Sequence, residues 1–350
     1  MIYVNARFLT QEMTGVQRFA EQICLALQSV RDDVVFLSPA NIKRIDTAQK
    51  LNVKVIGTRT GHLWEQIDLP RYLKKNDDPL LLNLGNTGPI LYRNQIITQH
   101  DVTYKRFPQS YSWKFKVIYN ALVPVLLRNA KSIITVSQFS KDEILKVYSF
   151  DKNDIDVIYN SASHYVKSDE KKERKERYFL AVSSANFHKN FHGLISEFLS
   201  ISKNVDIKLK IIGGISKNFT SIDFDSLVKS DERIQFLGRV SDTELSELYT
   251  NAVAFVFPSF YEGFGIPPLE AQACGCPVVS SNMASMPEVL GNSALFFDPL
   301  VRGEMSAALE LLEGDNELRE KLIMLGYENI KRFSWDKSAK ELSSIINRIK

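Results

Sequence analysis

The sequence is poor in the residues that cross-link small proteins or bind metals. It has three cysteines, Cys24, Cys274 and Cys276, among 350 residues, which is too few for a disulfide framework. The Cys-Gly-Cys pair has neither the spacing nor the second ligand pair of a zinc site. We therefore expect reduced thiols and a cytoplasmic protein.

Long apolar runs and a strong excess of one charge are also missing. No uncharged apolar stretch approaches the roughly 20 residues that cross a bilayer, and the N-terminus lacks the basic and apolar pattern of a signal peptide. The net charge is only +3, which argues against a protein that coats nucleic acid. No G-x-G-x-x-G follows the first predicted strand, so a dinucleotide fingerprint is absent.

The charge that is present is unevenly placed. Residues 1–165 carry 21 Lys and Arg against 15 Asp and Glu, and the remainder carries 23 against 26. In the basic half, residues 103–131 mix lysine and arginine with aromatic residues. Such mixing suits contact with an anionic lipid surface or a lipid-phosphate substrate, so we expect peripheral contact with the inner face of the cytoplasmic membrane. A solvated helix face with its aromatics turned inward explains the pattern nearly as well.

Continuous apolar segments alternate with helical patterns along most of the chain. Residues 16, 19, 23, 26 and 27 are apolar at helical spacing, whereas the predicted strands are apolar without alternation. That combination predicts parallel sheets covered by helices on both faces, an α/β fold. The predicted strands are 1–6, 33–38, 80–85, 94–101, 132–137, 155–160, 178–184, 207–214, 234–239, 253–259, 277–281 and 294–299.

A densely charged segment interrupts this alternation and predicts two domains. Residues 168–177 are too polar to be packed and are typical of a linker. We therefore expect an N-terminal domain at 1–167, a C-terminal domain at 178–334, and a last helix at 335–350 that packs back on the first domain. Ligands of such sheets bind beyond the carboxyl ends of the strands.

One stretch of the second domain, "FPSFYEGFGIPPLEAQACGCPVV" (257–279), places Glu262 and Glu270 among glycine, proline and apolar residues. Glu262 follows a predicted buried strand, and Glu270 lies in or near the first turn of a helix opened by two prolines. A metal site is one reading, but no histidine or further acid lies nearby. Hydrogen bonding to the diols of a nucleotide sugar is another. A structural role, with Glu262 in a turn and Glu270 favouring the helix N-terminus, remains open.

The stretch at 257–289 resembles the donor-binding segment of the retaining family-4 glycosyltransferases, which carry two glutamates separated by seven residues. The resemblance continues through "TGVQRFAEQI", "TQHDVTYKRFP", "IITVSQFSKDEI", "DVIYN", "HKNFHGLISEF" and "FLGRVSDTELSELY". It implies a GT-B fold, in which two Rossmann-like domains face each other across a cleft. Bacterial enzymes of O-antigen and surface polysaccharide assembly are the most similar kind. The reaction implied is hexose transfer from a nucleotide-diphosphate sugar to a saccharide acceptor, which we expect to be lipid-linked.

The resemblance also implies roles for single residues. Lys189 and His188, in "NFHKNF", would face the donor phosphates, although the family often has arginine where this chain has His188, so a fixed cation is lost. His100 would lie near the transferred sugar, and Gly15 would let the chain pass close to the diphosphate. The base would be bound by backbone groups near Gly238. The segment around Glu262 contributes the remaining donor contacts, from Gly263, Phe264, Gly265, Ile266 and Glu270.

Two Asp-x-Asp pairs, at 154–156 and 223–225, do not end buried strands, so we interpret both as structural and predict metal-independent transfer. No other cofactor is expected. A GT-B epimerase would need acid–base carboxylates in the first domain, and a non-catalytic sugar-binding scaffold is the alternative from a different class. The sequence leaves the donor sugar, base, acceptor and linkage open.

Overall fold

The computed structural model describes residues 1–151, 155–162, 176–182, 186–201, 206–213 and 231–350. The described chain divides into two compact units. Unit 1 comprises Met1–Asn160 and Ser334–Lys350, and unit 2 comprises Ser161–Phe333. The predicted linker at 168–177 lies outside the described residues up to position 175.

Unit 1 is built on a parallel sheet with the strand order β3-β2-β1-β4-β5-β6-β7 among its described residues. The strands are β1 (Ile2–Asn5), β2 (Val34–Ser38), β3 (Lys54–Val55), β4 (Leu80–Asn83), β5 (Gln95–Thr98), β6 (Ser132–Thr135) and β7 (Ile155–Val157). All four residues of β1 are buried, as expected for a central strand covered on both faces. The register pairs Asn5 with Leu37 on one side and Asn83 on the other, so polar residues meet where β1 and β4 end.

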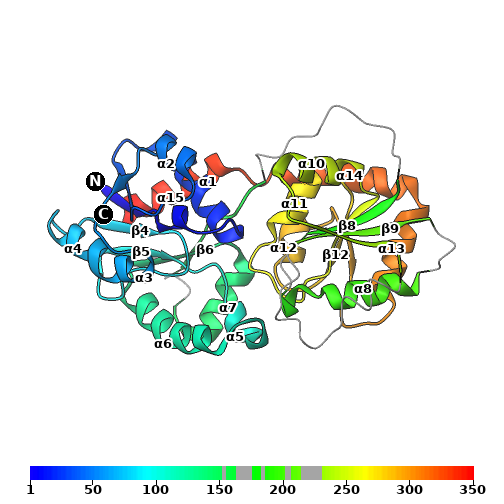
Figure 1. Ribbon diagram of the computed structural model, residues 1–350, viewed down its shortest axis with the longest axis horizontal. Coiled ribbons are helices and arrows are strands. Elements are labelled where there is room, and N and C mark those ends of the chain that lie inside the picture. The colour runs from blue at the N-terminus through cyan, green and yellow to red at the C-terminus, as the bar shows by residue number, and fades with distance from the viewer. Residues whose placement is uncertain (152–154, 163–175, 183–185, 202–205, 214–230) are drawn as a thin grey trace. The chain divides into compact units, whose positions relative to one another are not determined.

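Helices cover both faces of this sheet (Figure 1). They are α1 (Gly15–Val30), α2 (Ile45–Lys50), α3 (Gly61–Leu63), α4 (Leu69–Lys74), α5 (Thr103–Arg106), α6 (Trp113–Asn129), α7 (Gln138–Tyr148) and α15 (Trp335–Ile349), with the short helices η1 (Arg7–Thr10) and η3 (Pro108–Ser110) and the π-helix η2 (Trp64–Asp68).

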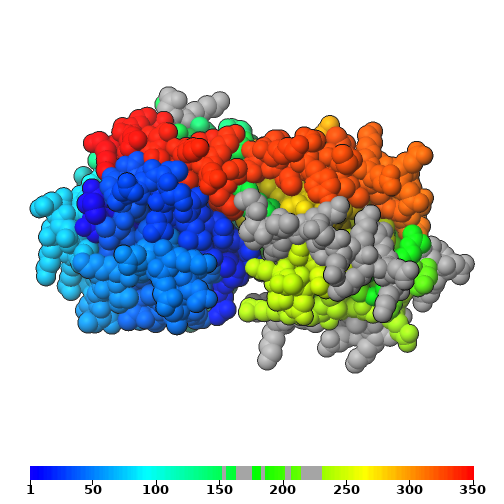
Figure 2. Space-filling model, turned by 90° about the horizontal axis from the view of Figure 1, so that it is seen from above, coloured from blue at the N-terminus to red at the C-terminus, as the bar shows by residue number. Residues whose placement is uncertain are grey.

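The C-terminal helix α15 packs against α1. The guanidinium of Arg31 donates hydrogen bonds to the Ser343 hydroxyl at 2.8 Å and to Asn347 at 2.7 Å. At the other end of α15, the ring of Trp335 lies 6.0 Å from that of Phe19. The red C-terminal residues accordingly lie directly on the blue N-terminal ones in Figure 2.

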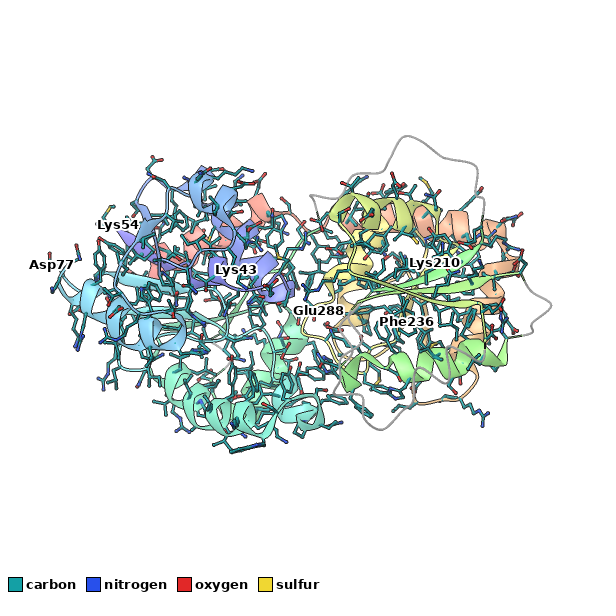
Figure 3. The ribbon with its side chains drawn as sticks, in the orientation of Figure 1. Lys43, Lys54, Asp77, Lys210, Phe236 and Glu288 are labelled. Atoms are coloured by element: carbon teal, nitrogen blue, oxygen red, sulfur yellow. The ribbon has the colours of Figure 1, made fainter. Side chains whose placement is uncertain are left out.

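Unit 2 repeats the architecture with the strand order β10-β9-β8-β11-β12-β13 among its described residues. Its strands are β8 (Tyr178–Val182), β9 (Lys208–Ile212), β10 (Ile234–Gly238), β11 (Ala254–Phe257), β12 (Val278–Ser281) and β13 (Leu295–Phe297), and its helices are α8 (Phe191–Ser200), α10 (Asp242–Asn251), α11 (Ile266–Ala273), α12 (Met286–Leu290), α13 (Glu304–Gly314) and α14 (Asn316–Ile330), with the short helix η5 (Phe187–Lys189). The labelled residues Lys210 and Phe236 lie on the neighbouring strands β9 and β10 (Figure 3).

The strands β8 and β11 are adjacent at the centre of the second sheet. Their apolar side chains join a core that includes Phe179, Phe198 and Val256. Because both strands run parallel, the loops that follow them leave the same edge of the sheet. The two parallel α/β sheets confirm the predicted fold class. Within the described residues, no helix is both long and apolar enough to cross a membrane.

Candidate functional site

The loop that follows β11 is held in place by hydroxyl groups from β12 and the segment after it. The Ser281 hydroxyl donates to the carbonyl of Ser259 at 2.6 Å, and the Ser285 hydroxyl donates to the carbonyl of Glu262 at 3.0 Å. Gly265 precedes α11 with a φ of +87°, a backbone conformation that residues other than glycine rarely adopt. These hydrogen bonds and the glycine conformation fix the backbone around Glu262.

Glu262 and Lys189, which are 73 residues apart, meet in this loop. The Lys189 Nζ lies 2.5 Å from the Glu262 Oε1. The side chains are only 17% and 12% exposed, respectively. Lys189 ends η5, which follows β8, so the two residues come from loops at the same sheet edge. The structure thus brings a cation and a carboxylate together beside the glycine turn.

His188, next to Lys189, is buried. Burial and the charge of Lys189 lower the pKa of His188 to about 3, so its imidazole is neutral near pH 7. Its carbonyl accepts a hydrogen bond from the amide of Phe260 at 2.8 Å, which ties η5 to the loop after β11. His188 therefore supplies a structural link and no cation where the family often has arginine.

Glu270 occupies the fifth position of α11 and is buried. The Tyr249 hydroxyl donates to its Oε2 at 3.4 Å. The side chains of both glutamates of the 257–279 stretch are therefore largely shielded from solvent. The other donor-segment residues, Gly263, Phe264, Gly265 and Ile266, are buried as well.

Gly238 ends β10 with a φ of +69°, and among the described residues no atom beyond its chain neighbours lies within 4 Å of the position that a Cβ would take. Its carbonyl accepts a hydrogen bond from the amide of Gly213 at 2.9 Å. Residues 214–230, including the Asp-x-Asp pair at 223–225, lie outside the described residues. As far as the described residues go, the space at Gly238 is compatible with the expected approach of a base.

Gly15 and His100, the candidates from the first domain, lie in unit 1. Gly15 is the exposed first residue of α1, and a Cβ there would meet no atom within 4 Å from the part of the chain that the structure describes. His100 follows β5 and is buried, with its ring edge-on to that of Phe19 at 5.0 Å. Burial lowers the pKa of His100. Its Nε2 lies 3.0 Å from the carbonyl of Leu84, and because a carbonyl only accepts, Nε2 must carry the hydrogen.

Comparison with known proteins decides the family. The model "Glycosyltransferase Family 4" matches residues 13–163, and the model "Glycosyl transferases group 1" matches residues 165–329. O-antigen chain mannosyltransferase RfbU of Salmonella typhimurium is 33% identical over 332 residues, which are 89% of this chain and 90% of that protein. O-antigen chain mannosyltransferase B of Escherichia coli is 32% identical over 268 residues, which are 71% of this chain and 70% of that protein.

The chain belongs to glycosyltransferase family 4. The resemblance to the family-4 glycosyltransferases that the sequence motifs indicated is thereby confirmed. Among solved structures, Alr3699/HepE of Anabaena, crystallised with UDP-glucose, matches this chain with a TM-score of 0.78 at 15% identity, covering 99% of both chains. At that identity the likeness bears on the fold alone, and it supports the GT-B class.

In this glycosyltransferase the first unit holds a polar cluster that the sequence did not reveal. Glu65, on the π-helix η2, is 1% exposed and accepts hydrogen bonds from Asn5 at 2.9 Å, Arg7 at 3.0 Å and Thr87 at 3.1 Å. The Nδ1 of His62 lies 3.2 Å from its second oxygen. The available signal was a single glutamate in the apolar run "HLWEQIDL", without a motif that would join it to Arg7.

The remaining acidic and cysteine candidates have structural surroundings. Within the described ranges no group of three His, Cys, Asp or Glu residues is arranged to hold a metal ion. Asp156, from the first Asp-x-Asp pair, forms an ion pair with Arg348 of α15 at 2.5 Å; its companion at 154 lies outside the described residues. The three cysteines are buried thiols.

Proposed function

We propose that the chain is a retaining, metal-independent hexosyltransferase that uses a nucleotide-diphosphate sugar. The observation that carries this proposal is the contact between Lys189 and Glu262 at the carboxyl edge of the second sheet. A sugar nucleotide presents a diphosphate, which an ammonium group stabilises, next to sugar hydroxyls, which a carboxylate can accept. The two side chains lie close enough to serve neighbouring parts of one such molecule.

Charge on the departing diphosphate must be stabilised during transfer. The neutral His188 does not contribute a cation, so we assign this role to Lys189 together with backbone amides of the glycine turn at Gly263 and Gly265. Glu262 would position the donor sugar, and Glu270 would accept from the nucleotide ribose. His100 would contact the transferred sugar.

The names of the relatives suggest the biological setting. The two sequence relatives described above are named as O-antigen chain mannosyltransferases. We therefore propose that this enzyme adds mannose to a lipid-linked saccharide acceptor in bacterial surface polysaccharide assembly. The test is thermal stabilisation by GDP-mannose, UDP-glucose, UDP-N-acetylglucosamine and dTDP-rhamnose, because a ligand that binds only the folded form raises Tm. Stabilisation by none of these would contradict a nucleotide-sugar site.

Product analysis tests the reaction type. With the stabilising donor and an accepted saccharide, we expect a product with the anomeric configuration of the donor sugar by NMR. Transfer should persist in EDTA. An inverted product would overturn the retaining assignment, and activity lost in EDTA and restored by Mg²⁺ or Mn²⁺ would overturn metal independence.

The helix α6 supports contact with a membrane. Its outward side exposes Trp113, Val117 and Ile118 at 67%, 60% and 57%, while Phe115 and Tyr119 stack on each other on the other side. Between Asp101 and Asp142 the chain has seven Lys and Arg and no acidic residue. An exposed apolar stripe flanked by cations fits the interface of an anionic bilayer.

We therefore propose that unit 1 docks on the cytoplasmic face of the membrane through α6, where a lipid-linked acceptor would be reached. Vesicles with phosphatidylglycerol should sediment the protein, and phosphatidylcholine vesicles or high salt should not. Trp113→Ser should weaken this binding, whereas Met324→Ser, which changes a similarly exposed apolar residue of unit 2, should not. Equal loss in both variants, or binding to neither vesicle, would contradict the proposal.

A further inference from the structure

The buried Glu65 is the centre of a rigid polar cluster at the carboxyl edge of the first sheet. Its Oε1 receives three side-chain hydrogen bonds, from the last residue of β1 (Asn5), from Arg7 and from Thr87. Burial alone would raise the pKa of Glu65, but the hydrogen bond from His62 and the charge of Arg7 hold it below the ordinary value. Glu65 is therefore a carboxylate, and it only accepts hydrogen bonds.

The charges in this cluster cancel. The Nε of Arg7 donates to Glu65, and its Nη2 donates to the Thr87 hydroxyl at 2.9 Å. The ion pair is almost wholly shielded from solvent, with side chains 10% and 1% exposed. A site next to this pair therefore carries little net charge, and it suits a neutral hydroxyl better than a phosphate.

His62 is the exposed member of the cluster. Its side chain is 59% exposed, and its Nδ1 lies 3.2 Å from Glu65 Oε2. Because the carboxylate cannot donate, Nδ1 must donate this hydrogen bond. In the neutral imidazole this leaves Nε2 as a hydrogen-bond acceptor on an accessible side chain.

The loop after β4 joins this cluster to His100. Thr87 of this loop donates to Glu65, and the side-chain oxygen of Asn86 accepts the His100 amide hydrogen at 2.8 Å. The Leu84 carbonyl of the same loop accepts from the His100 ring at 3.0 Å. One loop thus sets both the buried histidine and the exposed one at the edge where β1, β4 and β5 end.

We propose that His62 binds a hydroxyl of the saccharide acceptor, its Nε2 accepting that hydrogen bond, and that Glu65 is the positioning residue that fixes its tautomer. The inference rests on the proposed transferase function and adds a specificity residue to it. The irregular π-helix that carries Glu65 supports a functional role, because such segments recur at functional sites. A neutral Nε2 without hydrogen is unsuited to a phosphate oxygen, which also only accepts.

Steady-state kinetics with methyl α-mannoside and farnesyl-diphosphate-linked N-acetylglucosamine as acceptor probes tests the role of His62. In His62→Ala we expect acceptor KM to rise about threefold to tenfold, the range of one hydrogen bond. His62→Gln, whose side-chain oxygen can still accept, should recover part of this loss. Binding of the nucleotide sugar, measured by calorimetry, should stay unchanged in both variants. Leu63→Ala, at the exposed neighbour on α3, is the matched control.

The tautomer is tested without activity. A long-range ¹H–¹⁵N NMR spectrum of the wild-type protein should show a bare Nε2 and a protonated Nδ1 for His62. In Glu65→Gln the side-chain amide can donate to Nδ1, so the tautomer should reverse and acceptor KM should rise as in His62→Ala. A wild-type spectrum with hydrogen on Nε2, or an unchanged KM in His62→Ala, would overturn the inference. A wild-type enzyme that binds no nucleotide sugar would instead refute the proposed function.

Discussion

The ion pair in unit 2 predicts opposite effects for its two members on nucleotide binding. The Nζ of Lys189 has a partner, Glu262, at 2.5 Å. A bound diphosphate would accept a hydrogen bond from the Lys189 ammonium group and so replace part of its interaction with Glu262. Lys189→Met removes a charge-assisted hydrogen bond of about 1.5–3 kcal/mol, so UDP and GDP should bind roughly 10- to 150-fold more weakly.

Glu262→Gln should not weaken the bare nucleotides. The substitution removes a carboxylate that competes for Lys189 and that repels the phosphates, so Kd for UDP and GDP should stay equal or fall. The advantage of the nucleotide sugar over the bare nucleotide should shrink, because an amide oxygen replaces the carboxylate that accepts the sugar hydroxyls. Transfer should drop with it.

Isothermal titration calorimetry with UDP, GDP and the preferred nucleotide sugar measures both effects. The exposed ion pair between Lys331 and Glu328 of unit 2, at 2.6 Å and about two-thirds exposed on each side, provides the controls Lys331→Met and Glu328→Gln, which should change no Kd. Unchanged nucleotide affinity in Lys189→Met would refute the reasoning. So would an equal loss in both variants of the site, since that would mark the pair as structural.

Two further predictions concern stability. The pKa of the buried His188 is about 3, against about 6.5 in unfolded chains, so between these pH values the unfolded state binds more protons than the folded state. The free energy of unfolding should therefore fall by about 2 kcal/mol as the pH drops from 7 to 5. Urea unfolding of His188→Asn should show a smaller fall over this pH range, and the same fall as in the wild-type protein would contradict the assignment. Gly265→Ala places a Cβ against the Met286 side chain at a φ of +87° and should lower the free energy of unfolding by about 1–3 kcal/mol. Gly303→Ala should lower it less, because Gly303 has a φ of +89° but no described atom within 4 Å of the Cβ position. Equal melting temperatures of the two variants would show that the contact with Met286 has no effect on stability.

The sequence predicted the parts of the site that depend on strand order. Apolar runs located β8 and β11, and parallel strands necessarily release their following loops at one edge, so Lys189 and Glu262 were expected in one site. Their direct contact was not predictable, because side-chain pairing across 73 residues depends on the exact course of two loops. The burial of His188 was equally hidden, since nothing in "NFHKNF" tells an inward histidine from an outward one.

The cluster in unit 1 escaped prediction for a different physical reason. Arg7 and Glu65 are 58 residues apart, and each follows an unremarkable local pattern. The π-helix η2 has no periodicity that the 3.6-residue rule would detect. Only the three-dimensional register of β1 with β4, which sets Asn5 beside Asn83, shows that polar groups converge there.

The two units thus carry the same kind of ion pair in two physical forms. Arg7 is held by Glu65 and Thr87 in a fixed, shielded arrangement, and removing either charge would leave the other buried without compensation. Lys189 has a compact ammonium on a flexible stem and a more accessible partner, so we expect it to exchange Glu262 for the proposed donor phosphate. The shielded pair in unit 1 leaves its edge nearly neutral, which favours hydroxyl groups. The exchangeable pair in unit 2 offers a cation, which favours an anion. This difference in side-chain chemistry supports the proposal that the donor phosphates bind to unit 2 and the acceptor hydroxyls to unit 1.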